Sequence, residues 1–284
     1  MHKLLRQYAQ DMHKYKDQDF AFKGELGDYY RVMTDDGSWS LYSSSFDETC
    51  HSSSGAEIET QHVYIHGAGI SRHAMHALAH KKDLTILEVG LGTGMGVILS
   101  LNFLSQYFPD LSVSLYSLEI DPAFVFWLER NEEFRRSFIK IATAQDNTVS
   151  FKARCQPFSL HIVIGDARKS IRPLIAKGLK VQAIYQDAFG PRKNQTLWTV
   201  QWFEQLKQIA DANATLSTYC SAIAARKALQ QAGWGVRSFP GIGRKRSNTF
   251  ARLLGETDPK LLQQFEASPI LAFTDLTCDD KIMR

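Results

Sequence analysis

The residues of this sequence that are best placed to do chemistry follow short apolar segments predicted to be strands. Leu84–Val89 is the first such segment, and it runs into the loop Gly90-Leu91-Gly92-Thr93-Gly94 before a helical segment begins. Glycines let the backbone turn sharply and lie close to a ligand at the carboxyl edge of a sheet. A dinucleotide site would instead have the spacing G-x-G-x-x-G. The acid Glu88, just before the loop, would repel a pyrophosphate but favour a cationic ligand.

The loop therefore predicts a site for the sulfonium compound S-adenosyl-L-methionine (SAM), and a turn that binds nothing is the simplest alternative. The cofactor-binding residues predicted from this loop are Glu88, Gly90, Gly92 and Gly94.

Acidic residues also follow the next three predicted strands. Glu119 would accept hydrogen bonds from both ribose hydroxyls, Asp166 with Ala167 would meet the adenine amino group, and Asp187 would lie at the junction of cofactor and substrate. A single acid in such a position is often only a helix N-cap. Ligands of open α/β sheets bind beyond the carboxyl ends of the strands, however, so these acids would converge on the glycine loop.

The elements that must position these residues alternate between strand and helix from Asp83 onward. The predicted helices include Met95–Tyr107 and Ala123–Lys140. The predicted strands are Leu84–Val89, Leu111–Leu118, Leu160–Ile164, Val181–Tyr185, Ala214–Thr218, Trp234–Phe239 and Asn248–Leu254. Such alternation implies a mostly parallel sheet covered on both faces, with the last two strands adding an antiparallel edge. We therefore expect an α/β, Rossmann-like, seven-stranded Class I SAM-dependent methyltransferase fold.

The first quarter of the chain predicts an α+β cap on this core. Residues 1–18 have helical spacing, and two β-rich runs flank Asp36-Gly37 as in a hairpin. His62–Ile65 is predicted as a short strand and Ser71–His80 as a helix. The expected domains are a cap over residues 1–82, a methyltransferase core over 83–255 and a tail over 256–284.

Composition narrows the class of protein. With 44% hydrophobic and 22% charged residues the chain is ordinary for a soluble globular protein, and it has neither a membrane-length apolar run nor a secretory signal. Its 4 cysteines form no CxxC motif, which favours a reducing, cytoplasmic location and no membrane partner. The net charge is only +3, but residues 212–255 contain Lys and Arg without Asp or Glu, which points to a polyanion or to solvated helix faces.

Two segments of the core carry a family resemblance. Gln186-Asp187-Ala188-Phe189-Gly190-Pro191-Arg192-Lys193-Asn194, with Trp198 shortly after, and Phe239-Pro240-Gly241-Ile242-Gly243-Arg244-Lys245-Arg246 resemble the methyltransferase domain of the bacterial tRNA-modifying MnmC enzymes. The resemblance implies methylation of the aminomethyl group on the wobble uridine of tRNA, which completes 5-methylaminomethyl-2-thiouridine. Many members carry a C-terminal FAD-dependent oxidoreductase domain. This chain stops too early to hold one, so the resemblance implies a stand-alone enzyme without FAD, and a separate enzyme that supplies the aminomethyl intermediate is an expected partner.

The resemblance also suggests roles for individual residues. Asp187 is the predicted catalytic residue, since a carboxylate there would hold the amine and take up or relay its proton. Phe189 and Pro191 would form a wall around a splayed-out base. The anticodon stem-loop of tRNA would be held through its phosphates by Arg192, Lys193, Arg244, Lys245 and Arg246.

Other chemistries remain as alternatives. His62, His66, His73, His76 and His80 form a local cluster, but without recognised metal spacing, so no metal is expected. Cys50-His51 is an unpromising thiol and base pair in a Ser-rich loop. On the same fold, a methyltransferase or aminopropyltransferase acting on a small amine or metabolite is the main alternative, and a non-catalytic SAM- or RNA-binding adaptor is the second.

Overall fold

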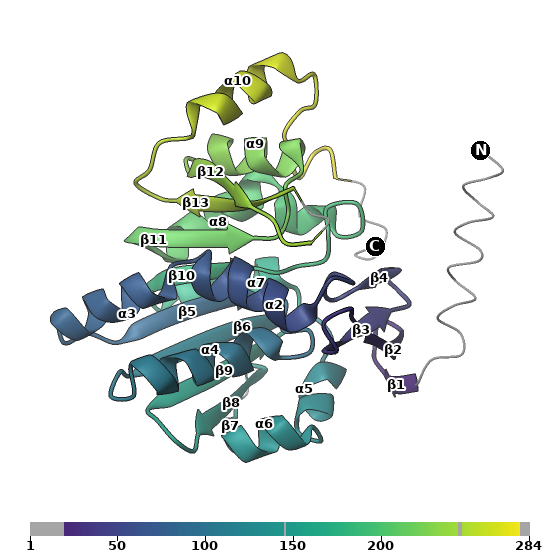
Figure 1. The fold of residues 1–284 in the computed structure, drawn as a ribbon, viewed down its shortest axis with the longest axis vertical. Coiled ribbons are helices and arrows are strands. Elements are labelled where there is room, and N and C mark those ends of the chain that lie inside the picture. The colour runs from purple at the N-terminus through teal and green to yellow at the C-terminus, as the bar shows by residue number, and fades with distance from the viewer. Residues whose placement is uncertain (1–19, 145, 244–245, 279–284) are drawn as a thin grey trace.

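A nine-stranded mixed sheet forms the centre of the molecule, and a smaller sheet lies beside it (Figure 1). The structure is a computed structural model that describes residues 20–144, 146–243 and 246–278. The predicted helix in residues 1–18 lies outside this range. The small sheet is antiparallel, and its strands are β1 (Phe20–Lys23), β2 (Asp28–Met33), β3 (Trp39–Ser43) and β4 (Glu48–Thr49).

The large sheet has the order β12-β13-β11-β10-β5-β6-β9-β8-β7. Its parallel strands are β5 (Leu84–Val89), β6 (Val113–Glu119), β9 (Phe158–Ile164), β10 (Val181–Gln186) and β11 (Ala210–Thr218). Antiparallel strands β12 (Gly235–Pro240) and β13 (Ser247–Arg252) form one edge. The predicted α/β class, its parallel centre and this antiparallel edge are therefore confirmed. The carboxyl ends of the parallel strands share one edge of the sheet, where ligands of such folds bind.

The sequence prediction of seven strands was too low, because a second antiparallel pair closes the other edge. β7 (Phe138–Thr143) pairs with β8 (Thr148–Ala153), which pairs with β9. The predicted helix Ala123–Lys140 is instead α5 (Ala123–Leu128) and α6 (Glu132–Ser137) followed by β7. Asn131 separates the helices, since its side chain caps α6 by accepting from the Phe134 N–H at 3.1 Å.

The N-terminal segment contains one confirmed and one wrong strand prediction. β2 and β3 form the predicted hairpin, with Gly37 at φ 81° in the connection. His62–Ile65 is not a strand but part of η1, a π-helix over Gln61–His66. Val63, Tyr64 and Ile65 are all buried, which a strand with one exposed face would not achieve. The neighbouring helices are α2 (Ala56–Thr60) and α3 (Ile70–Ala79), the latter close to the predicted range.

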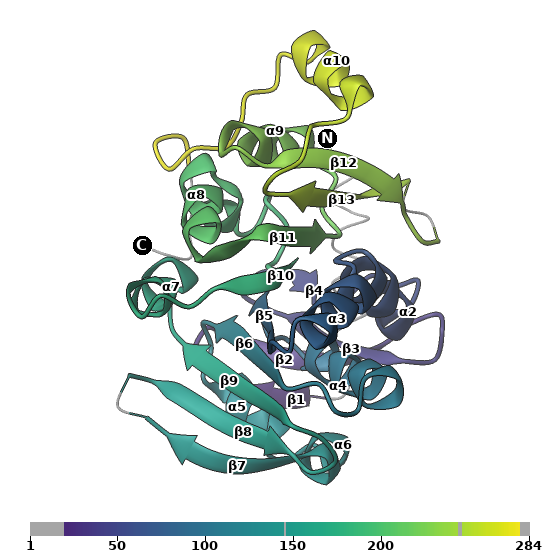
Figure 2. The ribbon, with the colours of Figure 1, turned by 90° about the vertical axis from the view of Figure 1, so that its left-hand side faces the viewer.

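Helices cover both faces of the large sheet (Figure 2). One face carries α3 and α4 (Met95–Tyr107) and the other carries α7 (Ala167–Ala176) and α8 (Val200–Ile209). The remaining helices are η2 (Gln195–Trp198), α9 (Ile223–Gln231) and α10 (Pro259–Ala267). Within the described ranges, none of the helices has the length and apolar character needed to cross a bilayer.

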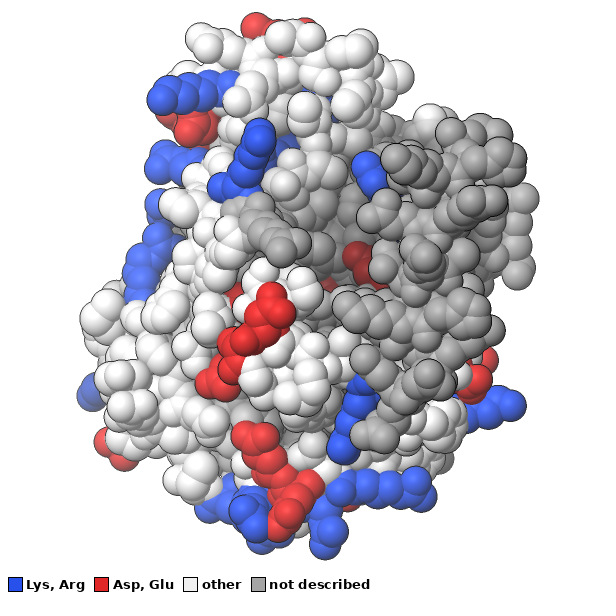
Figure 3. Space-filling view, turned by 45° about the vertical axis from the view of Figure 1, so that its right-hand side comes forward, with Lys and Arg blue, Asp and Glu red and all other residues white. Residues whose placement is uncertain are grey.

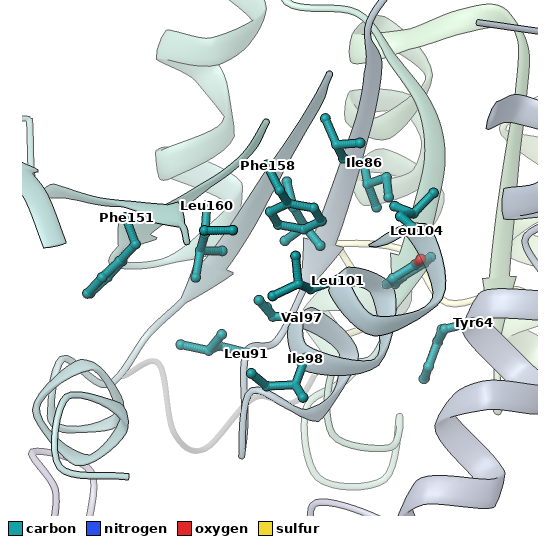
Figure 4. Close-up of a cluster of buried hydrophobic side chains, with 14 of the residues drawn as sticks. Tyr64, Ile86, Leu91, Val97, Ile98, Leu101, Leu104, Phe151, Phe158 and Leu160 are labelled. Carbon is teal, nitrogen blue, oxygen red and sulfur yellow. The ribbon is translucent and has the colours of Figure 1, made fainter. Parts of the chain in front are cut away.

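The two faces have separate cores. On the first, Val97 and Leu101 of α4 project toward Phe158 and Leu160 of β9 (Figure 4). On the second, four large aromatic side chains are almost completely buried, namely Trp198, Trp202, Phe203 and Trp234. Burying these side chains, at roughly 1.5–3 kcal/mol each, holds the sheet rigid and so fixes the loops at its carboxyl edge.

Candidate functional site

A pocket lies where the carboxyl ends of β5, β6, β9 and β10 meet the small sheet. Its lining combines the glycine loop, the residues after each of these strands, and residues of the N-terminal segment. Of the predicted site residues, those lining it are Gly90, Gly92, Glu119, Asp166, Ala167, Asp187 and Phe189. Strands far apart in sequence therefore bring these residues together, as the sequence analysis expected.

The glycine loop forms the floor of the pocket and needs its glycines for different reasons. Gly90, at φ 95°, faces the backbone after β10, where a Cβ would lie 2.8 Å from the Asp187 carbonyl oxygen. Gly92, at φ 50°, lies beside Cys50, where a Cβ would be 3.7 Å from the Cys50 sulfur. Gly94, at φ 76°, is the N-cap of α4 and does not line the pocket. The loop thus lies against the Asp187 backbone, and its positive φ angles at Gly90, Gly92 and Gly94 favour glycine.

Glu119 is a buried carboxylate that faces the pocket. Its two oxygens accept from the backbone N–H groups of Leu91 at 3.1 Å, Gly92 at 3.4 Å and Asp121 at 2.9 Å. Burial raises the pKa of Glu119 to about 7, although these hydrogen bonds oppose the shift. The side chain is therefore tied to the glycine loop and has oxygen lone pairs that a ligand hydroxyl can use.

Asp166 caps α7 and also lines the pocket next to Ala167. Its Oδ1 accepts from the Arg168 N–H at 3.1 Å, and its Oδ2 forms an ion pair with the Arg168 guanidinium at 3.1 Å. The capping role that a lone acid commonly has is thus present here, together with a position in the pocket.

Asp187 is bonded to a tyrosine that sequence reasoning did not single out. The hydroxyl of Tyr64, in η1, donates to Asp187 Oδ1. Burial and the Asp187 charge raise the pKa of Tyr64 well above its usual range, so this hydroxyl stays protonated. Tyr219 lines the same part of the pocket, and its hydroxyl donates to the Ala188 carbonyl oxygen at 2.8 Å. No local pattern could have indicated Tyr64, since it is 123 residues from Asp187.

Glu88, which was predicted to bind the cofactor, lies beneath the loop rather than in the pocket lining. It is buried, accepts from the Ser117 hydroxyl at 2.6 Å, and lies so close to Gly96 that no Cβ fits there. Burial raises the pKa of Glu88 to about 8, with the neighbouring Glu119 charge adding to the shift. The side chain therefore supports the loop from below.

The segment after β10 is clamped by the N-terminal segment. Phe189 stacks on Phe46 with ring centroids 4.3 Å apart, and Glu48 accepts from the Gly190 N–H at 3.1 Å. Lys193, predicted to bind tRNA, forms an ion pair with Asp47 at 2.9 Å. Pro191 and Arg192 lie on the same loop, outside the pocket lining, and Arg192 is exposed. Phe46 and Glu48 were missed because they lie in a Ser-rich segment without a recognisable motif, and Glu48 begins the two-residue strand β4.

Only some of the basic residues in the C-terminal half are exposed on the surface. Arg244 and Lys245 lie outside the described residues, and Arg246 is exposed. Arg226 is buried, and its guanidinium donates to Thr249 at 2.8 Å and to the Asn248 carbonyl oxygen at 3.0 Å. Figure 3 shows one face on which the described Lys and Arg side chains form separate groups, with Asp and Glu side chains between some of them.

The alternative metal and thiol sites receive no support from the geometry. Within residues 20–144, 146–243 and 246–278, His, Cys, Asp and Glu form no group of three that could hold a metal. Burial raises the pKa of the Cys50 thiol and lowers that of His51 to about 4, so a thiolate–imidazolium pair is disfavoured. His51 is held instead by the Ser40 hydroxyl, 2.9 Å from its Nδ1.

Comparisons with known proteins agree with this geometry. Residues 129–253 match the family described as S-adenosyl-L-methionine-dependent methyltransferase. The fold, the glycine loop and this match together define the fold of the Class I SAM-dependent methyltransferases.

Among curated proteins, the chain is similar to MnmC proteins. It is 30% identical over 256 residues to the tRNA 5-methylaminomethyl-2-thiouridine biosynthesis bifunctional protein MnmC of Burkholderia mallei, which covers 81% of this chain and 35% of that protein. The Ralstonia nicotianae protein of the same name is 29% identical over 229 residues, 74% of this chain and 32% of its own length. The chain thus spans about a third of the length of these curated relatives.

Solved structures extend the likeness to nearly the whole chain. The crystal structure of MNMC2 from Aquifex aeolicus has a TM-score of 0.71 at 25% identity, covering 99% of this chain and 94% of that one. Spermidine synthase from Thermotoga maritima has a TM-score of 0.53 at 12% identity over 89% of this chain and 79% of its own, which shows a shared fold.

Proposed function

We propose that this protein transfers a methyl group from SAM to the amine nitrogen of an aminomethyl group on the wobble uridine of tRNA. The observation that carries the proposal is the position of Asp187, whose backbone contacts the glycine loop while its carboxylate faces the same pocket. The MnmC relatives, whose name specifies 5-methylaminomethyl-2-thiouridine in tRNA, supply the substrate class.

The pocket residues fit SAM. Gly90 and Gly92 would let the backbone approach the ligand, because a Cβ at Gly92 would project into the pocket toward Cys50. Glu119 would accept hydrogen bonds from the ribose hydroxyls, and Asp166 with Ala167 would lie against the adenine. SAM would supply the methyl group, which the amine lone pair attacks as the carbon–sulfur bond breaks and S-adenosylhomocysteine leaves.

Asp187 would act on the amine. A primary alkylamine resembles lysine, with a pKa of ~10.4, and is mostly protonated near neutrality. The Asp187 carboxylate would hold the amine in line with the methyl group and take up or relay the proton that the nitrogen loses. Tyr64, which donates to Oδ1, would fix the orientation of this carboxylate.

The loop after β10 would bind the nucleic acid. The Phe189 and Phe46 rings, stacked 4.3 Å apart, and Pro191 would form a wall beside the flipped uridine. The residues proposed to contact phosphates of the anticodon stem-loop remain Arg192, Lys193, Arg244, Lys245 and Arg246. For Lys193 such a contact would compete with its ion pair to Asp47.

The wider expectations belong to the same proposal. Transfer to tRNA needs neither a metal nor FAD in this chain, it implies a cytoplasmic enzyme, and it implies a separate enzyme that supplies the aminomethyl intermediate. We also propose the division into a cap over 1–82, a core over 83–255 and a tail over 256–284. The separate four-stranded sheet over residues 20–49 supports an N-terminal unit, although α3 packs on the large sheet, and α10 lies in the tail.

The molecule that accepts the methyl group distinguishes this function from its alternatives. The protein would be incubated with methyl-labelled SAM and, separately, with tRNA bearing aminomethyluridine, tRNA lacking the aminomethyl group, and a polyamine. We expect label only in the first tRNA, in a nucleoside of the mass of methylaminomethyluridine. Label in the polyamine would favour a small-amine enzyme, and no label in any acceptor would favour an adaptor.

A further inference from the structure

A second hollow lies beside the proposed active site and is lined by basic and aromatic side chains. It is formed by β1, β2 and the end of α5. Its cations are Lys23, Arg31 and Arg130, and its rings are Phe22, Phe126 and Trp127. We call this feature the basic groove.

The lining of the basic groove itself carries only positive charge. It contains no Asp or Glu, and none of its three cations forms an ion pair with a described residue. The Arg31 guanidinium instead lies over the Trp39 ring, 5.5 Å from its centroid. Arg31 and Arg130 also line an adjoining hollow with Glu132 and Glu133, of which Glu132 pairs with Arg136, and Glu129 pairs with Lys140 at 2.5 Å.

A single layer of aromatic rings separates the basic groove from the pocket. Phe22 lines the groove, and its ring lies 4.7 Å from Tyr29 and 5.3 Å from Phe124. Tyr29 and Phe124 line the pocket. The basic groove therefore lies next to the pocket, with only this ring layer between them.

From these contacts we propose that the basic groove binds the RNA strand adjoining the nucleotide that enters the pocket. Phosphates would contact Arg31, Arg130 and Lys23, because clustered unpaired cations bind the RNA backbone by releasing its counterions. Phe126, which is 62% exposed, offers a ring face on which a base can stack. The inference rests on the proposed function, and its residues are distinct from the five proposed above to contact phosphates of the anticodon stem-loop.

The test compares three single variants, each of which removes one exposed positive charge. Arg31→Gln and Arg130→Gln lie in the groove. Arg172→Gln is the matched control, because Arg172 is exposed on α7, which packs on the opposite face of the large sheet. For each protein, tRNA affinity is measured from about 50 to 200 mM salt, and SAM affinity serves as a check on folding.

We expect each groove variant to weaken tRNA binding about threefold or more at low salt, and to reduce the slope of log affinity against log salt by about 1. Affinity for SAM and the behaviour of Arg172→Gln should match the wild type. Equal tRNA affinity in all four proteins, or an equal loss in Arg172→Gln, would overturn the inference.

The methylation assay on the same samples separates the two proposals. If the wild type methylates tRNA but the groove variants bind it normally, the groove inference fails and the proposed function stands. If the wild type binds tRNA through the groove but transfers no methyl group, the proposed function fails and the groove remains an RNA-binding surface.

Discussion

Asp187 connects the cofactor side of the pocket with the acceptor side. Its backbone N–H donates to the Val89 carbonyl oxygen at 3.0 Å, its carbonyl lies against Gly90, and its carboxylate accepts from Tyr64. A shift of this residue would therefore alter both the loop beneath the cofactor and the group that holds the amine. The proposed chemistry depends on this double connection.

Asp187→Ala should lose most turnover while keeping measurable SAM binding. The substitution removes the carboxylate but leaves the backbone contacts that shape the glycine loop. General acid–base groups contribute about 10²–10⁴-fold to a rate, so a loss in that range is expected. Labelled-methyl transfer to tRNA and calorimetry with SAM measure the two effects, and near-normal turnover would remove Asp187 from the mechanism.

Tyr64→Phe tests whether Tyr64 positions Asp187. A hydrogen bond to a charged group is worth about 1.5–3 kcal/mol, so kcat/KM should fall about tenfold or more. Without the donated hydrogen bond the carboxylate is protonated more easily, so the acidic limb of the rate profile should move to higher pH.

Tyr185→Phe is the control for Tyr64→Phe. Tyr185 is equally buried beside Tyr64, but its hydroxyl lies 3.0 Å from Ser100 Oγ. It should lose stability without a change in the pH profile. An unshifted profile in Tyr64→Phe, or the same shift in both variants, would show that Tyr64 acts only in packing.

Glu88→Gln should make stability less dependent on pH. The pKa of Glu88 rises from 4.5 to about 8 on folding, so between these values only the unfolded chain ionises. The folded state therefore loses stability as pH rises, by up to about 1.4 kcal/mol per pH unit. Glutamine does not ionise, so the variant should gain stability relative to the wild type from pH 5 to pH 8.

Urea unfolding of both proteins at several pH values measures this difference. Glu119, whose pKa is about 7, is present in both proteins and largely cancels in the comparison. A stability difference that does not change between pH 5 and pH 8 would contradict the account of Glu88.

At the scale of elements, Asp121 fastens the small sheet to the core. Its buried carboxylate accepts from the backbone N–H groups of Glu25 at 3.1 Å and Leu26 at 3.3 Å, and from the Tyr29 hydroxyl at 3.0 Å. It also accepts from the Ala123 N–H at 3.0 Å at the start of α5. One side chain thus joins the turn between β1 and β2 to the end of β6.

Asp121→Asn should lower the free energy of unfolding by about 2–3 kcal/mol, because the amide nitrogen cannot accept these hydrogen bonds and buried donors lose their partner. SAM affinity should also fall, since Tyr29 lines the pocket. Urea unfolding and calorimetry measure both effects. Asp110→Asn, at an exposed aspartate, is the control, and equal stability of the two variants would contradict this role.

Element types were predictable from the sequence where local signals agreed. The Asp36-Gly37 pair correctly predicted the hairpin of β2 and β3, and apolar runs correctly predicted the parallel strands. The start of β7 was missed because residues 123–140 have the spacing of one continuous helix. The helix is interrupted at Asn131, whose side chain caps α6, and without β7 its partner β8 was not predicted either. In β8, Val149, Phe151 and Ala153 are buried in alternation, which is the sequence signal that could have revealed this strand.

At the scale of the whole molecule, the site lies where the loops at the carboxyl edge of the large sheet meet the small sheet. The acids after β6, β9 and β10 could be predicted because parallel strands end at a common edge. Phe46, Glu48 and Tyr64 could not, because their positions depend on how the N-terminal segment packs on that edge. Arg226 could not be placed either. It was counted with the basic residues of the C-terminal half, but a count of charges does not show that this arginine is buried.

The central claim is that SAM binds across the carboxyl ends of β5, β6, β9 and β10. Isothermal titration of SAM into the folded protein tests it most directly. The account predicts saturable binding of one molecule per chain. Absence of binding to protein that is folded by circular dichroism would contradict it.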